Sequence, residues 1–348
     1  MQNNKFIGYV GTYTKEGSQG VYQFTLDTQS EKITDVKLAA KLENPTYVNV
    51  SANKKYLYAV AKEGSQGGVA SYAINHETGK LSKLNQELSD GANPCHVSTD
   101  SKTTQLVTAN YHKGTIESHL INEDGTISPT VSVMAHSGSG PHERQEKPHA
   151  HYSGFTPDEK FVVGVDLGTD EIVSYRIENG TLTKVASYST NSGSGPRHLT
   201  FHPNGKYAYV MTELSSEVIV LSYDMEKGRF TEKQYISTIP ETFTANNQGS
   251  AVHISSDGKF VYAGNRGHNS IAVFSVNQDT GGLTLVEIVS SEGDWPRDFV
   301  LDPTEAFVVG SNETTGNLVL YARNQSTGKL SVIQSDVKIP KAVCIKFL

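Results

Sequence analysis

Three residues that could do chemistry recur at one spacing, each six residues before a proline that marks a turn. The pairs are His151 with Pro157, Arg197 with Pro203, and Arg297 with Pro303. Histidine exchanges protons near neutral pH, and the guanidinium group of arginine binds carboxylate or phosphate oxygens through paired hydrogen bonds. These residue types at one position of a repeated unit predict a site that binds an anion and moves a proton.

Polar residues also recur where the strand after such a turn is expected to end. They are Asn110, Asp166, Glu213, Asn265 with Arg266, and Asn312. If the two sets lie on one face, a histidine, three arginines and two carboxylates converge there. Convergent charge of this kind is typical of an active site for an anion. Salt links between neighbouring structural units are the alternative interpretation.

The segment 136–151, HSGSGPHERQEKPHAH, is longer than the neighbouring linkers and rich in charge. It contains His136, His142, Glu143, Arg144, Glu146, His149 and His151. The spacing of His149 and His151 could ligate a metal, but the loop offers no further fixed carboxylate, so we expect no metal. The sequence SGSGP recurs at 192–196, directly before Arg197. Its glycines indicate either a close approach of the backbone to a neighbour or ligand, or a flexible linker.

The elements that would position these residues are short strands separated by turns. Runs such as KYLYAVA, KFVVGVD, KYAYVMT and KFVYAGN are rich in Val, Tyr and Phe, and the last two follow turns with Asn-Gly and Asp-Gly. Units of four strands begin at Pro45, Pro94, Pro148, Pro196, Gly249 and Pro296, with spacings of 49, 54, 48, 53 and 47 residues. Four-stranded units of this length are typical of β-propeller blades.

The two ends of the chain supply a seventh unit. Residues 5–41 begin with a second-strand pattern, FIGYVGTY, whereas PKAVCIKFL at 340–348 matches a first strand and then stops. Pairing of the two removes the free sheet edges. We therefore predict an all-β protein with one domain over 1–348, a seven-bladed propeller of four-stranded blades closed by its N- and C-terminal strands. In such blades the first strand starts, and the second ends, on the same face.

Composition argues against several functions. The 348 residues carry a net charge of −7 with interspersed signs, which argues against nucleic-acid binding. The start lacks a signal-peptide pattern and no run approaches a membrane span, so we expect a cytoplasmic monomer or homodimer without membrane contact. We interpret the two cysteines, Cys95 and Cys344, as buried small side chains in a reducing compartment.

Several segments match the pattern of one enzyme family. They are GPHERQEKPHAH, VDLGTDEIVSY, GSGPRHLTFHPNGKYAYVMTELSSEV, SSDGKFVYAGNRGHNSIAVFSV and WPRDFVLDPT. Over nearly its whole length the chain resembles the propeller-type bacterial 6-phosphogluconolactonases, whose superfamily also contains fungal carboxy-muconate lactonizing enzymes. The resemblance implies a seven-bladed propeller with a catalytic cluster of His149 or His151, Arg197, Glu213 and Arg266. Substrate contacts are expected from Arg144, Asp166, Asn265 and Arg297.

The resemblance implies hydrolysis of 6-phospho-D-glucono-1,5-lactone, a phosphorylated sugar lactone, without a cofactor. Opening the lactone needs an activated water and stabilisation of a tetrahedral oxyanion. We expect Glu213 to deprotonate water with help from His151, Arg197 to stabilise the oxyanion, and Arg266 and Arg297 to hold the phosphate. The reverse assignment, with histidine as base and Glu213 orienting it, stays open. So do a lactonizing or other sugar-lactone enzyme and a non-catalytic binding propeller.

Overall fold

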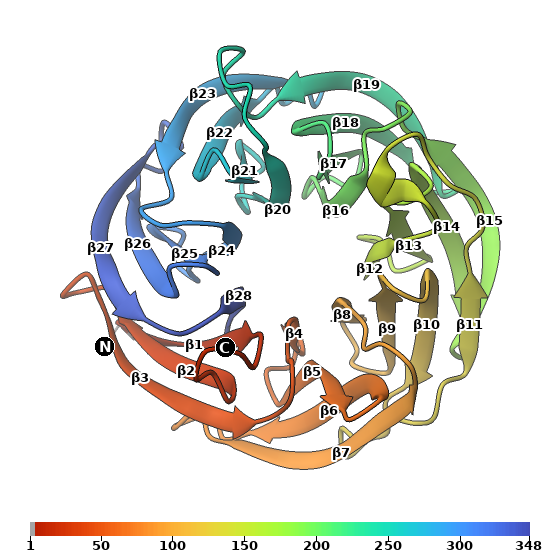
Figure 1. The fold of residues 1–348 in the computed structure, drawn as a ribbon, viewed down its shortest axis with the longest axis horizontal. Coiled ribbons are helices and arrows are strands. Elements are labelled where there is room, and N and C mark those ends of the chain that lie inside the picture. The colour runs from red at the N-terminus through yellow and green to blue at the C-terminus, as the bar shows by residue number, and fades with distance from the viewer. Residues whose placement is uncertain (1–3) are drawn as a thin grey trace.

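Residues 4–348 are described by a computed structural model, in which seven four-stranded antiparallel sheets form a ring (Figure 1). Within six of the sheets the strands follow one another from the axis outward in chain order. The only helix among the described residues is a single 3-10 turn, η1 (Glu143–Gln145). This architecture confirms the predicted all-β, seven-bladed propeller. No helix of residues 4–348 is long and apolar enough to cross a membrane.

Each blade contributes one strand to each of four concentric positions. The innermost strands are β28 (Ala342–Phe347), β4 (Val48–Val50), β8 (His96–Thr99), β12 (Ala150–Phe155), β16 (Pro196–Phe201), β20 (Gln248–Ile254) and β24 (Pro296–Leu301). The second strands are β1 (Lys5–Thr12), β5 (Tyr56–Glu63), β9 (Gln105–Asn110), β13 (Phe161–Asp166), β17 (Tyr207–Thr212), β21 (Phe260–Arg266) and β25 (Phe307–Asn312). The third strands are β2 (Gly20–Asp27), β6 (Gln66–Ile74), β10 (Thr115–Leu120), β14 (Glu171–Glu178), β18 (Glu217–Asp224), β22 (Ser270–Val276) and β26 (Asn317–Arg323). The outermost strands are β3 (Lys32–Lys41), β7 (Leu81–Asp90), β11 (Ser132–Ala135), β15 (Thr181–Ser189), β19 (Arg229–Ser237), β23 (Leu283–Ser290) and β27 (Leu330–Lys338).

One blade joins the two ends of the chain. β28 pairs antiparallel with β1, with Ile345 opposite Val10 and Phe347 opposite Gly8. Ile345 and Val10 are fully buried in a core cluster that also contains Phe307 of the preceding blade. The pairing confirms the predicted closure, and it covers the edge of β1 that would otherwise be free.

A repeated tyrosine joins one blade to the next. In four blades a buried tyrosine of the second strand donates a hydrogen bond from its hydroxyl to a glycine carbonyl in the outer turn of the following blade. The pairs are Tyr9–Gly79 at 2.8 Å, Tyr58–Gly125 at 3.2 Å, Tyr209–Gly281 at 3.0 Å and Tyr262–Gly328 at 2.9 Å. All four glycines have positive φ, which other residues adopt at a cost. The turns that reveal the repeat in the sequence therefore also hold neighbouring blades together.

Removal of residues 340–348 should open the ring, because it strips β28 from β1 and exposes the core that Ile345 covers. We expect the truncated chain to aggregate or to melt well below the full chain. The single substitution Ile345→Ala should lower the free energy of unfolding by about 2–5 kcal/mol, the usual cost of a buried Ile to Ala change.

The control for this prediction is Val332→Ala on β27, where the side chain is 42% exposed. It should change the free energy of unfolding by less than about 0.5 kcal/mol. Thermal and denaturant unfolding measure all three proteins, and a truncated chain as stable as the full one contradicts the closure.

Candidate active site

A cavity of about 240 Å³ lies where the innermost strands begin. Its lining residues are Tyr13, Thr46, Asn93, Pro94, Cys95, Tyr111, His112, Arg144, His151, Glu213, Arg266 and Arg297. Five of these, namely Arg144, His151, Glu213, Arg266 and Arg297, are predicted site residues. A sixth, Arg197, lines a smaller adjoining chamber and contacts Glu213. Most of the residues that were predicted from the sequence to share one face therefore lie around this cavity.

A β-bulge changes the direction of the side chains that the innermost strands contribute to the site. In four blades the pairing of the first two strands skips one residue near the start of the first strand. The skipped residues are His151, Arg197, Arg297 and, in the closing blade, Val343. A bulged residue falls out of the regular alternation, which re-aims its side chain. This local irregularity explains how three residues at one repeat position come together near the axis.

Two adjacent positions at the ends of the second strands have different roles. The first position holds Asn110, Asp166, Thr212, Asn265 and Asn312, which are all buried. The next position holds Glu213 and Arg266, and also Tyr13 and Tyr111 in two other blades, and all four line the cavity. Because successive strand residues face opposite sides, one step along the chain separates the supporting position from the cavity position.

Asp166 and Asn265, both expected to touch substrate, occupy the supporting position and do not line the cavity. The Asp166 carboxylate accepts hydrogen bonds from the backbone amides of His149 and Gly168 at 2.8 Å. Asn265 donates to the Thr238 carbonyl at 2.9 Å and accepts from its hydroxyl at 2.7 Å. Both side chains are therefore committed to the loops around them, and their contact with substrate stays a prediction.

Glu213 is the centre of the polar cluster. Its side chain is 2% exposed, and its carboxylate binds Arg197 Nε at 3.0 Å, Arg266 at 2.7 Å, and Arg144 on its other oxygen. Burial disfavours the charged form, but the attraction of Arg266 and Arg197 outweighs it and holds the pKa of Glu213 well below its usual range. Glu213 is therefore a persistent carboxylate and a weak base.

The four arginines differ in exposure, which gives the cavity two ends. The side chains of Arg197 and Arg266 are 3% and 4% exposed, whereas those of Arg297 and Arg144 are 20% and 32% exposed. Arg266 Nε and one terminal nitrogen of Arg144 are buried without a hydrogen-bond partner among residues 4–348. Because an unmet buried donor is costly, these two atoms mark positions where ligand oxygens can bind.

His151 is one of the two histidines that line the cavity, the other being His112. His151 is almost fully buried, with Nδ1 3.8 Å from Cys95 Sγ and its ring edge-on to Tyr111 at 5.7 Å. Burial, reinforced by the positive charge of Arg197, lowers the pKa of His151 well below its usual range. The imidazole is therefore neutral at pH 7 and can accept a proton.

His149 faces away from the cavity lining. Its ring stacks on Tyr111 at 4.1 Å, Nδ1 lies 2.9 Å from the Tyr111 carbonyl, and Nε2 lies 3.2 Å from Glu146. The structure thus separates the two histidines that the motif alone left equivalent. Within residues 4–348 no three His, Cys, Asp or Glu side chains are grouped to hold a metal ion.

Two glycine-rich loops position the arginines. In the loop before β12, the buried Gln145 donates to the Leu167 carbonyl at 2.8 Å, which fixes η1 and its Arg144. The loop at 192–196 is held by Asp170, whose carboxylate accepts from the amides of Gly193 and Gly195 at 2.7 and 2.8 Å. The loop then leads directly into Arg197.

Seven cavity residues were not anticipated as site residues: Tyr13, Thr46, Asn93, Pro94, Cys95, Tyr111 and His112. The two tyrosines stand one place after the ends of β1 and β9, as Glu213 does after β17, so repeat position was the available signal. Cys95 lines the cavity instead of lying wholly in the core, and burial raises the pKa of its thiol to about 12. It is therefore a thiol at neutral pH.

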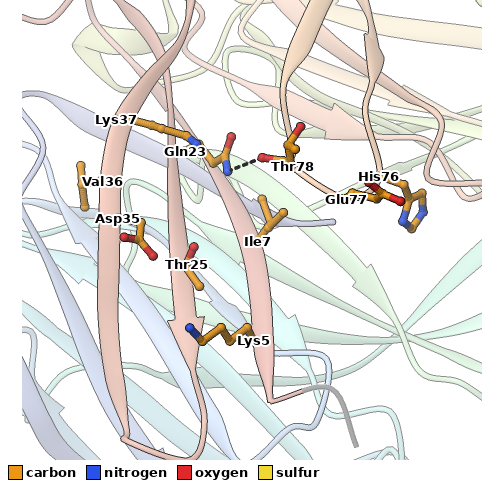
Figure 2. A pocket seen from close by; sticks show the side chains of 10 residues that line it. All are labelled: Lys5, Ile7, Gln23, Thr25, Asp35, Val36, Lys37, His76, Glu77 and Thr78. Carbon is orange, nitrogen blue, oxygen red and sulfur yellow. Dashed lines mark hydrogen bonds between the residues drawn. The ribbon is translucent and has the colours of Figure 1, made fainter. Parts of the chain in front are cut away.

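A second hollow, a groove of about 500 Å³, lies on the first blade (Figure 2). Lys5, Gln23 and Asp35 come from β1, β2 and β3, and Thr78 comes from the turn between β6 and β7. Lys5 begins β1, whereas Tyr13 of the cavity follows its end, so the groove is remote from the arginine cluster.

Comparison with known proteins agrees with this fold. The family described as lactonase with a seven-bladed β-propeller matches residues 7–347. The chain belongs to this lactonase family. It is 56% identical over 344 residues, or 99% of each chain, to a Bacillus subtilis protein named 6-phosphogluconolactonase.

Solved structures of family members superpose closely on this lactonase. A Lactobacillus plantarum protein has a TM-score of 0.95 at 44% identity, with 99% of each chain covered. The periplasmic gluconolactonase of Pseudomonas aeruginosa has a TM-score of 0.94 at 29% identity, also with 99% of each chain covered. The protein is thus an enzyme of the lactone-hydrolase class.

Loss of the central carboxylate should destabilise the fold. Glu213→Ala leaves buried arginines without a counter-charge, so we expect the free energy of unfolding to fall by about 3–5 kcal/mol. Glu226→Ala is the control, because Glu226 is 80% exposed in a surface pair with Lys160 and should change little. Denaturant unfolding at pH 7 gives the comparison, and equal losses in the two variants would contradict the central role of Glu213.

The contribution of Glu213 to the free energy of unfolding should also depend on pH. Its folded-state pKa is depressed below the ordinary value of 4.5, so the stabilisation is complete above that pH and is lost as pH falls through the folded-state pKa. The stability difference between wild type and Glu213→Gln should therefore shrink as pH is lowered from about 5 to about 3.

Proposed function

We propose that this lactonase hydrolyses 6-phospho-D-glucono-1,5-lactone to 6-phosphogluconate, the lactone-opening step of the pentose phosphate pathway, in the cytoplasm. The main support is an excess of positive charge. Four arginines gather at and beneath the cavity, and among residues 4–348 only the carboxylates of Glu213 and Glu313 pair with them. The name of the Bacillus subtilis relative points to the same substrate.

The exposure of the arginines suggests how the substrate lies. The phosphate would occupy the more solvated end, held by Arg144 and Arg297, because guanidinium groups match phosphate oxygens. The lactone carbonyl would lie at the buried end, where Arg266 Nε is free to stabilise the oxyanion. Arg197, which binds Glu213 beneath the cavity, adds further positive charge there. In this arrangement Arg266 contacts the reacting atoms rather than the phosphate.

Proton transfer is assigned to His151. The neutral imidazole accepts a proton from water as the water oxygen attacks the acyl carbon, and it returns a proton to the ring oxygen when the acyl–oxygen bond breaks. Glu213 is the less suitable base because its pKa is low and both carboxylate oxygens already bind arginines. Its role is then to position the guanidinium groups.

An unphosphorylated sugar lactone is the second candidate substrate. The Pseudomonas aeruginosa relative is named a gluconolactonase, and the buried end of the cavity could open such a lactone without a phosphate contact. The two candidates differ in what they require of the exposed arginines.

Hydrolysis of freshly generated 6-phosphogluconolactone and of gluconolactone, by wild type and Arg297→Ala, tests the substrate. We expect wild type to prefer the phosphorylated lactone. Arg297→Ala should raise KM for that substrate roughly 10–100-fold, the scale of losing a charged hydrogen bond, and should barely affect gluconolactone. Assays contain EDTA throughout, since no proposed step uses a metal. Equal efficiency of wild type on both lactones would favour the second candidate.

Replacement of His151 tests the assigned base. His151→Asn should lower kcat roughly 10²–10⁴-fold for both lactones, the usual contribution of a general base, with little change in KM. His149→Asn is the comparison, because His149 lies outside the cavity lining and its loss should cost far less. If His151→Asn keeps most of its kcat, the base lies elsewhere and Glu213 becomes the next candidate.

A further inference from the structure

The smaller chamber that adjoins the cavity, and that Arg197 lines, has a volume of about 30 Å³. Five residues border both spaces: Tyr13, Thr46, Cys95, His151 and Arg297. The residues that border only the small chamber are Tyr47, Arg197, His198, Asp298 and Val343. His198 and Asp298 directly follow the bulged residues Arg197 and Arg297, so the chamber extends farther along the innermost strands.

The chamber matches a water molecule in both size and polarity. A buried water needs roughly 10–15 Å³ and two to four polar partners, so this space holds one or two waters and excludes a sugar. His198, Asp298, Thr46 and Tyr47 bring polar side chains to its wall. We propose that this chamber binds the water that attacks the lactone, and that His151 receives the proton of that water at the boundary between the two spaces.

The proposal rests on the proposed function and adds the site at which water, the second substrate of the hydrolysis, binds. A lactone that fills the outer cavity blocks direct entry of water from the mouth. A water held beneath it can reach the acyl carbon from the far side. The water oxygen bonds to that carbon, one water proton passes to His151, and the acyl–ring-oxygen bond then breaks. The ring oxygen takes the proton from His151, and the carboxylic acid formed ionises in solution.

The groups around the chamber suit this task. His198 Nε2 lies 3.3 Å from Arg197 and must accept its hydrogen bond, so His198 carries its own proton on Nδ1. The Asp298 carboxylate lies 3.9 Å from Lys346 Nζ, whose positive charge favours the ionised form. It accepts a hydrogen bond from the Ile345 amide at 2.9 Å and pairs with His253 at 3.2 Å. It can hold one water hydrogen as an acceptor. Arg197, which also borders the chamber, favours the negative charge that develops on the water oxygen.

Val343→Leu tests the proposal, because it adds a methylene to the wall of the chamber without adding charge. We expect kcat to fall roughly 10²-fold, the scale of misplacing a reactant by about 1 Å, with KM and inhibition by 6-phosphogluconate unchanged. Val252→Leu on β20 is the matched control, since it enlarges a buried innermost-strand valine that does not border the chamber. It should keep wild-type kcat. A folded Val343→Leu protein with wild-type kcat overturns the proposal.

A crystal structure of the wild-type protein at high resolution gives a second test that does not depend on the variant folding. We expect an ordered water within hydrogen-bond distance of His198 or Asp298, and a dry chamber overturns the proposal. Failure of the proposed substrate has a different signature, namely a wild type inactive on 6-phosphogluconolactone. In that event Val343→Leu is assayed on whichever lactone wild type opens, where the same loss of kcat is expected.

Discussion

The site depends on one buried carboxylate. Glu213 follows β17, and it binds arginines from the loop before β12, from β16 and from β21. Three guanidinium groups at this separation would repel one another strongly in a poorly solvated site. The carboxylate offsets that repulsion, so the arginines are buried and oriented before an anion arrives. Such preorganisation lets them stabilise developing charge without rearranging during the reaction.

Burial and the positive charge of the arginines together set the different protonation states of Glu213 and His151. Arg197 favours the charged carboxylate and disfavours the charged imidazole, so it lowers the pKa of both. A base with a low pKa binds a proton weakly before the oxyanion has formed. In the proposed mechanism, the oxyanion neutralises part of the arginine charge as it forms, so the imidazolium that forms at the same moment is less strongly disfavoured. The positive charge therefore opposes protonation of His151 until the transition state creates its counter-charge.

Much of the fold could be predicted from the sequence, because each blade repeats the same turns and apolar runs. The chain ends identified the closing blade because FIGYVGTY and PKAVCIKFL are complementary halves of one unit. The site was harder, since a strand presents alternate faces and one residue decides the outcome. Asp166 and Asn265 stand at the supporting position, whereas Glu213 and Arg266 stand at the position that lines the cavity. The bulge that re-aims His151 and the stacking that removes His149 are tertiary effects without a sequence signal of their own.

The proposed mechanism separates the chemistry of lactone opening from recognition of the rest of the substrate. Arg197 and Arg266 are buried and tied to one another through Glu213, so replacing one of these three residues disturbs the others. Arg144 and Arg297 are more exposed, and Arg144 stands on a loop whose anchors, Gln145 and Asp166, do not line the cavity. A change of substrate within this fold can then proceed by altering the outer loop and rim. The buried cluster, in which several charges must balance at once, leaves far less freedom to vary.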